Sequence, residues 1–457
     1  MVDEMINNIY NFIDGKKILI LGYSREGKST YDFIRKQLKD VKIAILDYNI
    51  IDKIDDENVE VYCDNEYEKY FKRFDVIIKS PGVSIKRQLY DKYSEKIVSQ
   101  TSLFLQYSKN VVIGITGTKG KSTTSSLIHH IIKSCNLDSK LVGNIGTPIL
   151  SEINDIKDNT IIVFEMSSHQ LQYVNKSPKI SILLNIYEEH LDYYESFNEY
   201  ILAKENIYKF QNKNDLIIYN SSFVNTNINI NNILKIGQRR IPIYINNLDI
   251  KEENYINIVE DRIIFYLDKS ELIINKKDIK TNLKGDHNLY NIAVAVAAVN
   301  EIGITIKDAF KAISSFYGLE HRMEYVGKYN DINFYNDSIA TIPEATICAI
   351  KSLGNVDTVI IGGKDRGINY LKLIEFLNNY DINKVLLIAA SGRKIYDLLG
   401  DKNDKYIYAE NLEDAVELCK LYTSKNGICL LSPASASHGY YKNFEERGKV
   451  FKELVRK

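Results

Sequence analysis

Short apolar runs that end in a glycine, aspartate or serine recur along this chain, and they constrain its fold more than any other feature. Near the N-terminus they predict strands at residues 17–22, 41–47 and 74–82, with a helix over residues 29–38. Buried strands that alternate with helices form parallel sheets, whose ligands bind beyond the carboxyl ends of the strands. The first stretch therefore predicts an open α/β unit, although many such units bind nothing at that edge.

The same alternation returns twice. A second series of strands is predicted at residues 110–116, 160–166 and 180–186, before a β-rich extension over residues 212–278 and a buried helix over residues 288–301. A third series is predicted at residues 332–337, 357–363, 384–389, 406–410 and 428–434. We therefore predict an α/β protein of three domains, with boundaries at residues 1–108, 109–317 and 318–457.

Charge and composition narrow the classes of partner. Among 457 residues, 59 are Lys or Arg and 60 are Asp or Glu, so there is no electrostatic case for binding nucleic acid or an anionic membrane. The five cysteines form no C-x-x-C pair, which favours reduced thiols. No signal peptide and no apolar run of the roughly 18–20 residues that span a bilayer is evident. We expect a cytoplasmic protein, monomeric because no interface is evident.

The most specific motif is GITGTKGKSTTSSLIHH, residues 114–130, which follows a predicted strand and opens a predicted helix. Gly117 and Gly120 let backbone N–H groups approach phosphates, and a helix N-terminus favours negative charge. Lys121 can reach the β and γ phosphates, and the Ser122 hydroxyl can ligate Mg²⁺. Ile115 stands where the strict pattern has glycine. The segment predicts a site for a nucleoside triphosphate.

Three polar residues follow the next predicted strands or the helix after them. Glu165 ends one strand, His190 follows another, and Lys204 lies in a helix further along. Taken singly they are a helix cap, a satisfied polar residue and a solvated helix position. Together with a phosphate loop they suit a Mg²⁺ site, because Mg²⁺ uses few protein ligands alongside phosphate oxygens.

These motifs, with several others, resemble those of the Mur ligases, the ATP-dependent amino-acid-adding enzymes of peptidoglycan synthesis. The resemblance covers nearly the whole chain, in the segments TGTKGKST, GNIGTP, FEMSSHQL, NIYEEHLD, KGDHNLYN, LEHRMEYV and NDSIAT. Lys119 stands where the family commonly has asparagine. The closing segment LLSPASASHGYYKNFEERG resembles the glutamate-adding member.

The resemblance implies a cytoplasmic, ADP-forming ligase that adds D-glutamate to UDP-N-acetylmuramoyl-L-alanine through an acyl phosphate, and so serves cell wall, cell shape and cell division. It implies a Rossmann-like domain for the UDP precursor, a central P-loop ATPase-type domain for ATP, and a Rossmann-like C-terminal domain for the amino acid. Mg²⁺ is the implied cofactor, and Lys204 is the implied carrier of a CO₂-derived carbamate. An unmodified Lys204 would repel the metal, whereas a carbamate would support it.

Individual residues carry over by position. The implied catalytic residues are Lys121, His190 and Lys204. The ATP-binding residues are Gly117, Thr118, Lys119, Gly120, Lys121, Ser122, Thr123, Asn291, Arg322 and Asp337. The metal ligands are Ser122, Glu165, His190 and Lys204 as its carbamate. The precursor-binding residues are Arg25, Glu26, Ser80, Pro81, Gly82 and Asn144. The glutamate-binding residues are Thr341, Arg366, Ser437 and Phe444.

Two departures keep alternatives open. Ile339 stands where D-glutamate ligases usually have lysine, and Arg366 stands where lysine is common. A sister branch that adds L-glutamate has a motif similar to NDSIAT. A folylpolyglutamate synthetase shares the ATP loop but lacks the UDP-binding unit, and a non-catalytic nucleotide-binding scaffold would not need Lys121, Glu165, His190 and Lys204 together. Because a hydrolysable acyl phosphate must be kept from water, we also expect the domains to close.

Overall fold

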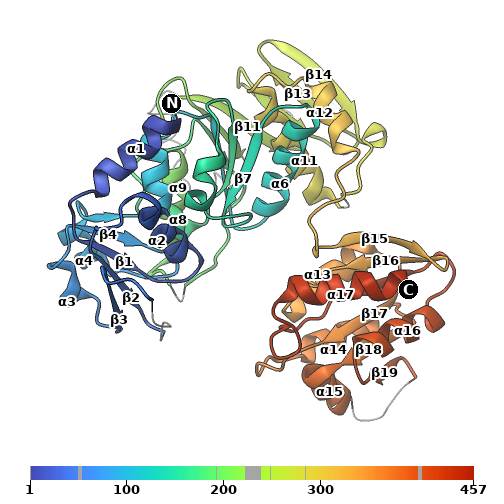
Figure 1. Ribbon diagram of the computed structural model, residues 1–457. Helices are drawn as coiled ribbons and strands as arrows, with labels where there is room; N and C mark the ends of the chain where they lie inside the picture. Colours follow the sequence, from blue (N-terminus) through green and yellow to red (C-terminus); the bar gives the residue numbers. More distant parts are fainter. Residues whose placement is uncertain are drawn as a thin grey trace. The chain divides into compact units, whose positions relative to one another are not determined.

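A computed structural model describes residues 2–49, 54–191, 193–221, 238–247, 249–283, 285–399 and 404–457. Its helices and parallel strands alternate, which confirms the predicted α/β class (Figure 1). Two compact units are present, one formed by Met1–Lys280 with Leu289–Ser314 and the other by Thr281–Asn288 with Ser315–Lys457. The division into three domains stays a prediction.

The first sheet is fully parallel, in the order β3-β2-β1-β4-β5. Its strands are β1 (Ile18–Leu21), β2 (Ile43–Asp47), β3 (Val59–Cys63), β4 (Val76–Lys79) and β5 (Ile97–Val98). Its helices are α1 (Val2–Ile13), α2 (Arg25–Gln37), α3 (Glu68–Phe71), α4 (Arg87–Tyr93) and α5 (Gln100–Tyr107). Strands β1, β2 and β4 confirm the three predicted strands, because strands covered on both faces read as continuous apolar runs.

The differences from the predicted elements have simple causes. Strand β3 was missed because it lies at the edge of the sheet with its side chains exposed or half-buried, so no apolar run marks it. Helix α2 begins four residues before the predicted start, at Arg25, directly after its N-cap Ser24. That start brings Arg25 and Glu26 into the first turn of the helix.

The second sheet has the order β14-β13-β12-β11-β10-β9-β6-β8-β7. Its strands are β6 (Val112–Thr116), β7 (Ser139–Gly143), β8 (Ile161–Glu165), β9 (Ile180–Leu183), β10 (Leu216–Asn220), β11 (Arg239–Ile245), β12 (Tyr255–Ile258), β13 (Arg262–Leu267) and β14 (Ser270–Asn275). The helices of this region include α6 (Lys121–Ser134), α7 (Ile149–Glu152), α8 (Ser168–Leu171), α9 (Phe197–Lys209), α11 (Asp286–Asn300) and α12 (Ile306–Ile313). Strands β12, β13 and β14 pair antiparallel and extend the sheet as predicted, although residues 222–237 and 248 of that extension lie outside the described residues.

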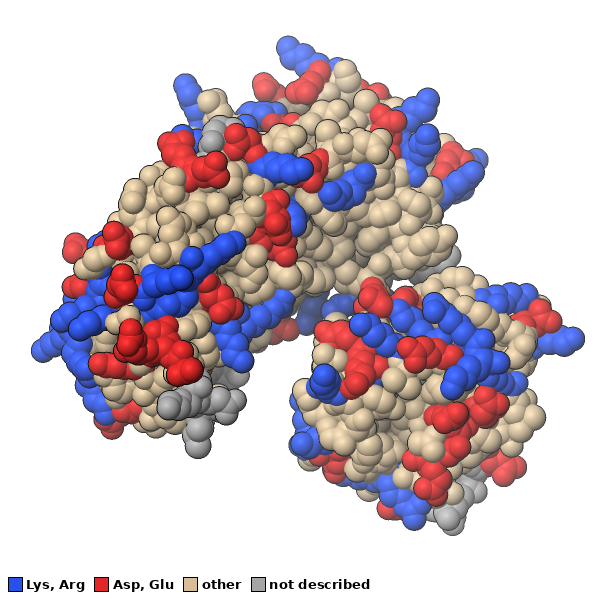
Figure 2. Space-filling view, viewed as in Figure 1, with Lys and Arg blue, Asp and Glu red and all other residues tan. Residues whose placement is uncertain are grey.

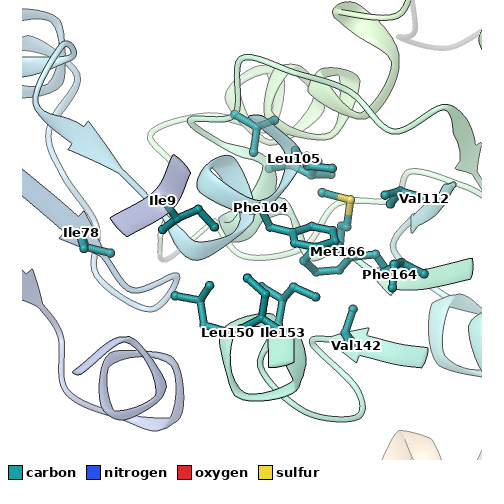
Figure 3. Close-up of a cluster of buried hydrophobic side chains, with 14 of the residues drawn as sticks. Ile9, Ile78, Phe104, Leu105, Val112, Val142, Leu150, Ile153, Phe164 and Met166 are labelled. Carbon is teal, nitrogen blue, oxygen red and sulfur yellow. The ribbon is translucent and has the colours of Figure 1, made fainter. Parts of the chain in front are cut away.

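One buried hydrophobic cluster joins the first two sheets (Figure 3), and a separate cluster packs on the first sheet alone. Ile9 of α1, Ile78 of β4 and Phe104 of α5 belong to the same buried cluster as Phe164 of β8 and Val142 of β7. Helix α5 packs on both α1 and α7, and α2 also packs on α7. The predicted boundary between residues 108 and 109 therefore separates two sheets that are held together by one core.

The third sheet has the order β15-β16-β20-β17-β18-β19, parallel except for the first pair. Its strands are β15 (Glu324–Tyr329), β16 (Ile332–Asn336), β17 (Val356–Gly362), β18 (Lys384–Ile388), β19 (Tyr406–Ala409) and β20 (Ile428–Leu431). One face is covered by α13 (Pro343–Leu353), α14 (Leu371–Asn379) and α15 (Ala389–Leu398). The other is covered by α16 (Leu412–Tyr422) and α17 (Phe444–Arg456). The five strands predicted here are confirmed.

Within the described ranges, no helix is both long and apolar enough to cross a bilayer. Acidic and basic side chains are intermixed over the face drawn in Figure 2, as the balanced charge leads one to expect.

Candidate functional site: a phosphate loop and a strand-end crevice

The predicted phosphate loop joins β6 to α6 and has the backbone that its glycines anticipate. Gly117 and Gly120 have φ angles of +155° and +86°, where L side chains are strained. A Cβ atom on Gly120 would lie 2.8 Å from the Asn291 Oδ1 atom. Gly120 is also the N-cap of α6, a helix of 14 residues. The loop therefore presents backbone N–H groups at a helix N-terminus, the arrangement that binds phosphate.

Asn185, which follows β9, holds this loop in shape. Its Oδ1 atom accepts hydrogen bonds from the backbone N–H groups of Thr118 (3.1 Å) and Lys119 (2.8 Å), and its Nδ2 atom donates to the Lys119 carbonyl (2.9 Å). Asn185 lies in the segment NIYEEHLD but was not among the predicted site residues. Its position directly after a buried strand was the available signal.

Two lysines meet at the carbonyl of Gly117. The Lys121 Nζ atom donates to the carbonyls of Gly117 (2.7 Å) and Thr118 (2.9 Å), so its side chain folds over the loop. The Lys204 Nζ atom donates to the same Gly117 carbonyl at 2.9 Å and lies 4.7 Å from the ring centre of Tyr200. Lys204 is only 1% exposed, and burial together with the nearby Lys121 charge holds its pKa well below the usual range. The fold thus brings Lys204 to the phosphate loop, as the resemblance implied.

Glu165 ends β8 and is completely buried. Its Oε1 atom accepts from the Asn144 side chain (2.8 Å) and its Oε2 atom from the Ser125 hydroxyl (3.4 Å), in the second turn of α6. Asn144, implied as a contact of the muramoyl group, is therefore hydrogen-bonded to a predicted metal ligand.

His190 has a φ of +60° and an exposed side chain. Its ring centre lies 4.8 Å from that of His169 and 6.1 Å from that of Tyr200, and its Nε2 atom lies 3.8 Å from a carboxylate oxygen of Glu189. Glu189 also pairs with Lys119 of the phosphate loop at 2.7 Å. The loop after β9 is thereby joined to the phosphate loop by an ion pair as well as by Asn185.

The donor set is compatible with Mg²⁺ beside a nucleotide. In the described part of the chain no three His, Cys, Asp or Glu residues are grouped so as to hold a metal alone. Ser122, Glu165 and His190 offer a hydroxyl, a carboxylate and an imidazole, and Mg²⁺ completes its shell with phosphate oxygens and water. The residues therefore fit a metal whose other ligands come from the substrate.

The predicted precursor turns lie at the carboxyl ends of β1 and β4. The Ser80 hydroxyl donates to the Gly22 carbonyl at 2.7 Å, and a Cβ atom on Gly27 would lie 2.1 Å from that same oxygen. Glu26 accepts from the Gln170 side chain at 2.7 Å through Oε1, while its buried Oε2 has no hydrogen-bond partner among the described residues. Burial raises the pKa of Glu26. Arg25 is exposed beside it, and Gly82 is exposed after the half-buried Pro81.

Lys79 is a residue of this region that the sequence analysis missed, because it ends an otherwise apolar strand. Its Nζ atom lies within hydrogen-bond distance of the carbonyls of Ser80 (3.2 Å) and Pro81 (3.4 Å) and of the Tyr193 hydroxyl (3.3 Å). Burial lowers the pKa of Lys79 to about 7. Tyr193 belongs to the loop that carries His190, so Lys79 joins the precursor turn to that loop.

The predicted adenine and ribose contacts are divided between the two units. Asn291 lies in the first unit, where its Oδ1 atom accepts from the Thr124 hydroxyl at 3.3 Å. Arg322 and Asp337 lie in the second unit. Asp337 accepts from the Met323 N–H (3.2 Å) and the Ser432 hydroxyl (2.9 Å), and burial raises its pKa to about 7. Arg322 is exposed, and its charge opposes that rise.

A crevice is expected where the third sheet reverses its strand order, between β20 and β17. The loop after β17 leads to α14 on one face, and the loop after β20 leads to α17 on the other. Open α/β sheets bind ligands at such a reversal, beyond the strand ends. The four predicted glutamate contacts lie in the segments around it: Thr341, Arg366, Ser437 and Phe444.

Hydrogen bonds connect these segments to one another. The Arg366 Nη2 atom donates to the Thr341 carbonyl at 3.3 Å, and the Ser338 hydroxyl donates to the Phe444 carbonyl at 2.8 Å. Ser437, 3% exposed, lines a cavity of about 70 Å³ together with Gly362, Gly363 and Arg447. Ile339, the departure from the lysine of D-glutamate ligases, is half-buried, and its N–H donates to the His321 carbonyl at 3.1 Å.

The phosphate loop and the sheets define a P-loop protein of the α/β class. Two domain families match the chain: the Mur ligase middle domain, over residues 115–299, and the Mur ligase glutamate ligase domain, over residues 321–435. A UDP-N-acetylmuramoylalanine–D-glutamate ligase of Clostridium kluyveri is 31% identical, with 97% of each chain covered, and one of Clostridium acetobutylicum is 32% identical, with 98% of each covered. The chain belongs to the Mur ligase family, whose members are ATP-dependent ligases that form peptide bonds.

Solved structures agree at the level of the fold. The MurF ligase of Thermotoga maritima in complex with ADP matches with a TM-score of 0.55 at 16% identity, covering 96% of this chain and 95% of that one. The UDP-N-acetylmuramate–alanine ligase MurC of the same organism matches with a TM-score of 0.54 at 17% identity, covering 96% and 99%. These structures show the shared fold, while the two domain families and the Clostridium relatives confirm the family resemblance carried by the sequence motifs.

Proposed function

We propose that this ligase adds glutamate to UDP-N-acetylmuramoyl-L-alanine with cleavage of ATP to ADP and phosphate. One observation carries the proposal: the buried Lys204 amine and the phosphate-loop Lys121 converge on the Gly117 carbonyl. A plain nucleotide-binding scaffold gives no reason to bury a second lysine against its phosphate loop. The two Clostridium relatives, named as D-glutamate ligases, support the choice of substrates.

The reaction has two steps. An alanine carboxylate oxygen attacks the γ-phosphorus, the bond to the β,γ-bridging oxygen breaks, and ADP leaves an acyl phosphate behind. The glutamate amine then attacks the acyl carbon, the C–O bond breaks, phosphate leaves and the nitrogen loses a proton. Lys121 and the N–H groups of residues 117–123 offset charge on the phosphoryl oxygens. His190, on the exposed edge of the site, is a candidate base for that proton.

Mg²⁺ would be held by Ser122, Glu165 and His190, where it would neutralise phosphate charge. Lys204 suits a carbamate, since CO₂ reacts with a neutral amine and burial favours that form. In its unmodified form the Lys204 amine donates to the Gly117 carbonyl at 2.9 Å, and a carbamate keeps one N–H on the same nitrogen. The modification would therefore place a carboxylate anion near the phosphates, where the unmodified residue has an amine.

The precursor and the amino acid are assigned to strand ends. Arg25, Glu26, Ser80, Pro81, Gly82 and Asn144 are proposed to hold the UDP-muramoyl part, and the unpartnered Glu26 Oε2 atom leaves a hydrogen-bond acceptor for it. Thr341, Arg366, Ser437 and Phe444 are proposed to hold glutamate, and Asn291, Arg322 and Asp337 the adenosine. The expected cytoplasmic location, monomeric state and three domains remain predictions.

Assay of ADP and phosphate release with ATP, Mg²⁺ and UDP-N-acetylmuramoyl-L-alanine tests the proposal, with D- and L-glutamate compared. Turnover with D-glutamate alone supports assignment to the D-glutamate ligases and makes Ile339 a tolerated change. Turnover with L-glutamate alone moves the chain to the sister activity, which the missing lysine at position 339 favours. No turnover with either overturns the ligase proposal.

A further inference from the structure

The loop after β9 contacts two of the proposed sites. At its start the Asn185 side chain holds the phosphate loop, and the ion pair of Glu189 with Lys119 adds a second link. Further along, Tyr193 lies against the precursor turn after β4, residues 80–83. One short loop is therefore in contact with the site proposed for ATP and with the site proposed for the precursor.

The hydroxyl of Tyr193 lies among polar atoms of the precursor turn. It donates to the Val83 carbonyl at 2.9 Å, and the Pro81 carbonyl and the Gln172 Oε1 atom each lie 3.2 Å from the same oxygen. The buried Lys79 amine donates to that oxygen at 3.3 Å. Burial raises the pKa of Tyr193, so the hydroxyl keeps the proton that it donates. A shift of the precursor turn must therefore change the contacts of Tyr193.

Tyr193 also fixes the position of His190. His190 has a φ of +60°, a conformation that is uncommon for residues other than glycine and that neighbouring groups must hold. Its carbonyl accepts from the N–H groups of Tyr193 (3.0 Å) and Tyr194 (3.1 Å). The His169 ring packs edge-on against the Tyr193 ring, with centres 4.1 Å apart, and against the His190 ring, with centres 4.8 Å apart. The backbone and the rings thus give two routes from Tyr193 to His190.

The proposed reaction needs such a connection, because the alanine carboxylate of the precursor must meet a γ-phosphate held at the phosphate loop. We propose that Tyr193 is a positioning residue: its hydroxyl holds the loop after β9 against the precursor turn, so that a precursor bound there places His190 beside the nucleotide. This inference rests on the proposed function and adds a coupling between two of its substrates. Coupled binding is reciprocal, so the nucleotide should strengthen binding of the precursor by the same factor.

Calorimetry of UDP-N-acetylmuramoyl-L-alanine binding to the full chain tests the coupling, with and without a saturating non-hydrolysable ATP analogue and Mg²⁺. In the unchanged protein the analogue should tighten precursor binding by roughly 5- to 150-fold, the usual range of coupling between sites. Tyr193→Phe keeps the ring against His169 but loses the hydroxyl, and should reduce that factor to about threefold or less. In turnover its KM for the precursor should rise by roughly 2- to 10-fold, the range of one hydrogen bond, while KM for glutamate stays within about twofold.

Tyr173→Phe is the matched control. The Tyr173 hydroxyl donates to the Ile85 carbonyl at 3.2 Å, two residues beyond the precursor turn, so this variant loses a similar hydrogen bond outside residues 80–83. Its coupling factor should stay within about twofold of that of the unchanged protein. His169→Phe keeps a ring between Tyr193 and His190 and should retain most of the coupling, whereas His169→Ala should lose it as Tyr193→Phe does.

The outcomes separate this inference from the proposed function. An unchanged coupling factor in Tyr193→Phe overturns the inference, even if the variant unfolds at a lower temperature, because a purely structural hydrogen bond would alter stability alone. Absence of coupling in an unchanged protein that binds the precursor overturns it as well. Coupled binding without turnover of either glutamate enantiomer supports the inference but refutes the glutamate-adding function. A protein that binds no precursor refutes both.

Discussion

The phosphate loop and the proposed glutamate crevice are built in different ways to hold the anions that we assign to them. The loop is one short segment that offers its backbone N–H groups, with glycines at positive φ and a helix N-terminus behind them. The crevice is built from side chains on the segments after β16, β17 and β20 and at the start of α17, connected by Arg366, Ser338 and Arg447. Backbone recognition suits a ligand shared by many enzymes, whereas side chains suit a ligand that differs between relatives.

The largest effect should follow the loss of the loop's cation. Lys121→Ala should lower kcat by roughly 10³-fold, because a phosphate-bound cation offsets charge that develops during transfer. Steady-state ADP release measures it. Lys133→Ala, at an exposed position of the same helix, should leave kcat within about twofold. Near-normal turnover of Lys121→Ala would mean that backbone groups alone carry the phosphoryl transfer.

A substitution in the proposed glutamate crevice should weaken the binding of glutamate without affecting ATP. Arg366→Leu should raise KM for glutamate by roughly 10- to 100-fold, through loss of a charged hydrogen bond, while KM for ATP stays within about twofold. Substrate titrations separate the two constants. The exposed Arg393→Leu in the same unit is the control. Equal rises in both constants would contradict the separation of the two sites.

Loss of Asn185, which holds the phosphate loop in shape, should have a smaller effect on substrate binding. Asn185→Leu removes three hydrogen bonds that shape residues 118–119 and should raise KM for ATP by roughly tenfold, with KM for glutamate little changed. Asn212→Leu, at an exposed position of the same unit, should change neither constant. An unaltered KM for ATP would show that the glycines hold the loop without Asn185.

The smallest effects concern pH and have opposite signs in the two units. The folded pKa of Lys79, about 7, is lower than in the unfolded chain, so stability rises as pH increases from about 7 towards 10.5. The folded pKa of Asp337, about 7, is higher than its pKa in the unfolded chain. The stability of the fold therefore decreases as the pH increases from about 3.8 to about 7. Thermal unfolding should show a weaker rise above pH 7 in Lys79→Met and a weaker fall below it in Asp337→Asn. Unchanged slopes would refute these assignments.

The loop and the crevice also differ in how far sequence alone predicted them. Residues 117–122 are contiguous, so their spacing predicted strand, loop and helix, and the fold confirms that placement. Asn185 and Lys79 were not predicted as site residues, because their roles depend on contacts with residues distant in sequence. Asn185 supports a loop 66 residues away, and Lys79 ends a buried strand and contacts Tyr193. The burial of Arg447 was not predicted, because a charged residue near the start of a helix is usually exposed to solvent. Edge strand β3 escaped because exposed side chains leave no apolar run.

The buried cluster that the first two sheets share has a thermodynamic consequence. Ile78, one residue before Lys79, and Phe164, one residue before Glu165, are buried in the same cluster (Figure 3). A ligand that binds the native form stabilises the whole cooperative unit, not just its own contacts. A uridine nucleotide held by the turns after β1 and β4 should therefore slow hydrogen exchange in β8 as well, and ADP in the loop should protect β1 in return. Binding of a ligand at either site would then raise the unfolding temperature of the segments that form the other site.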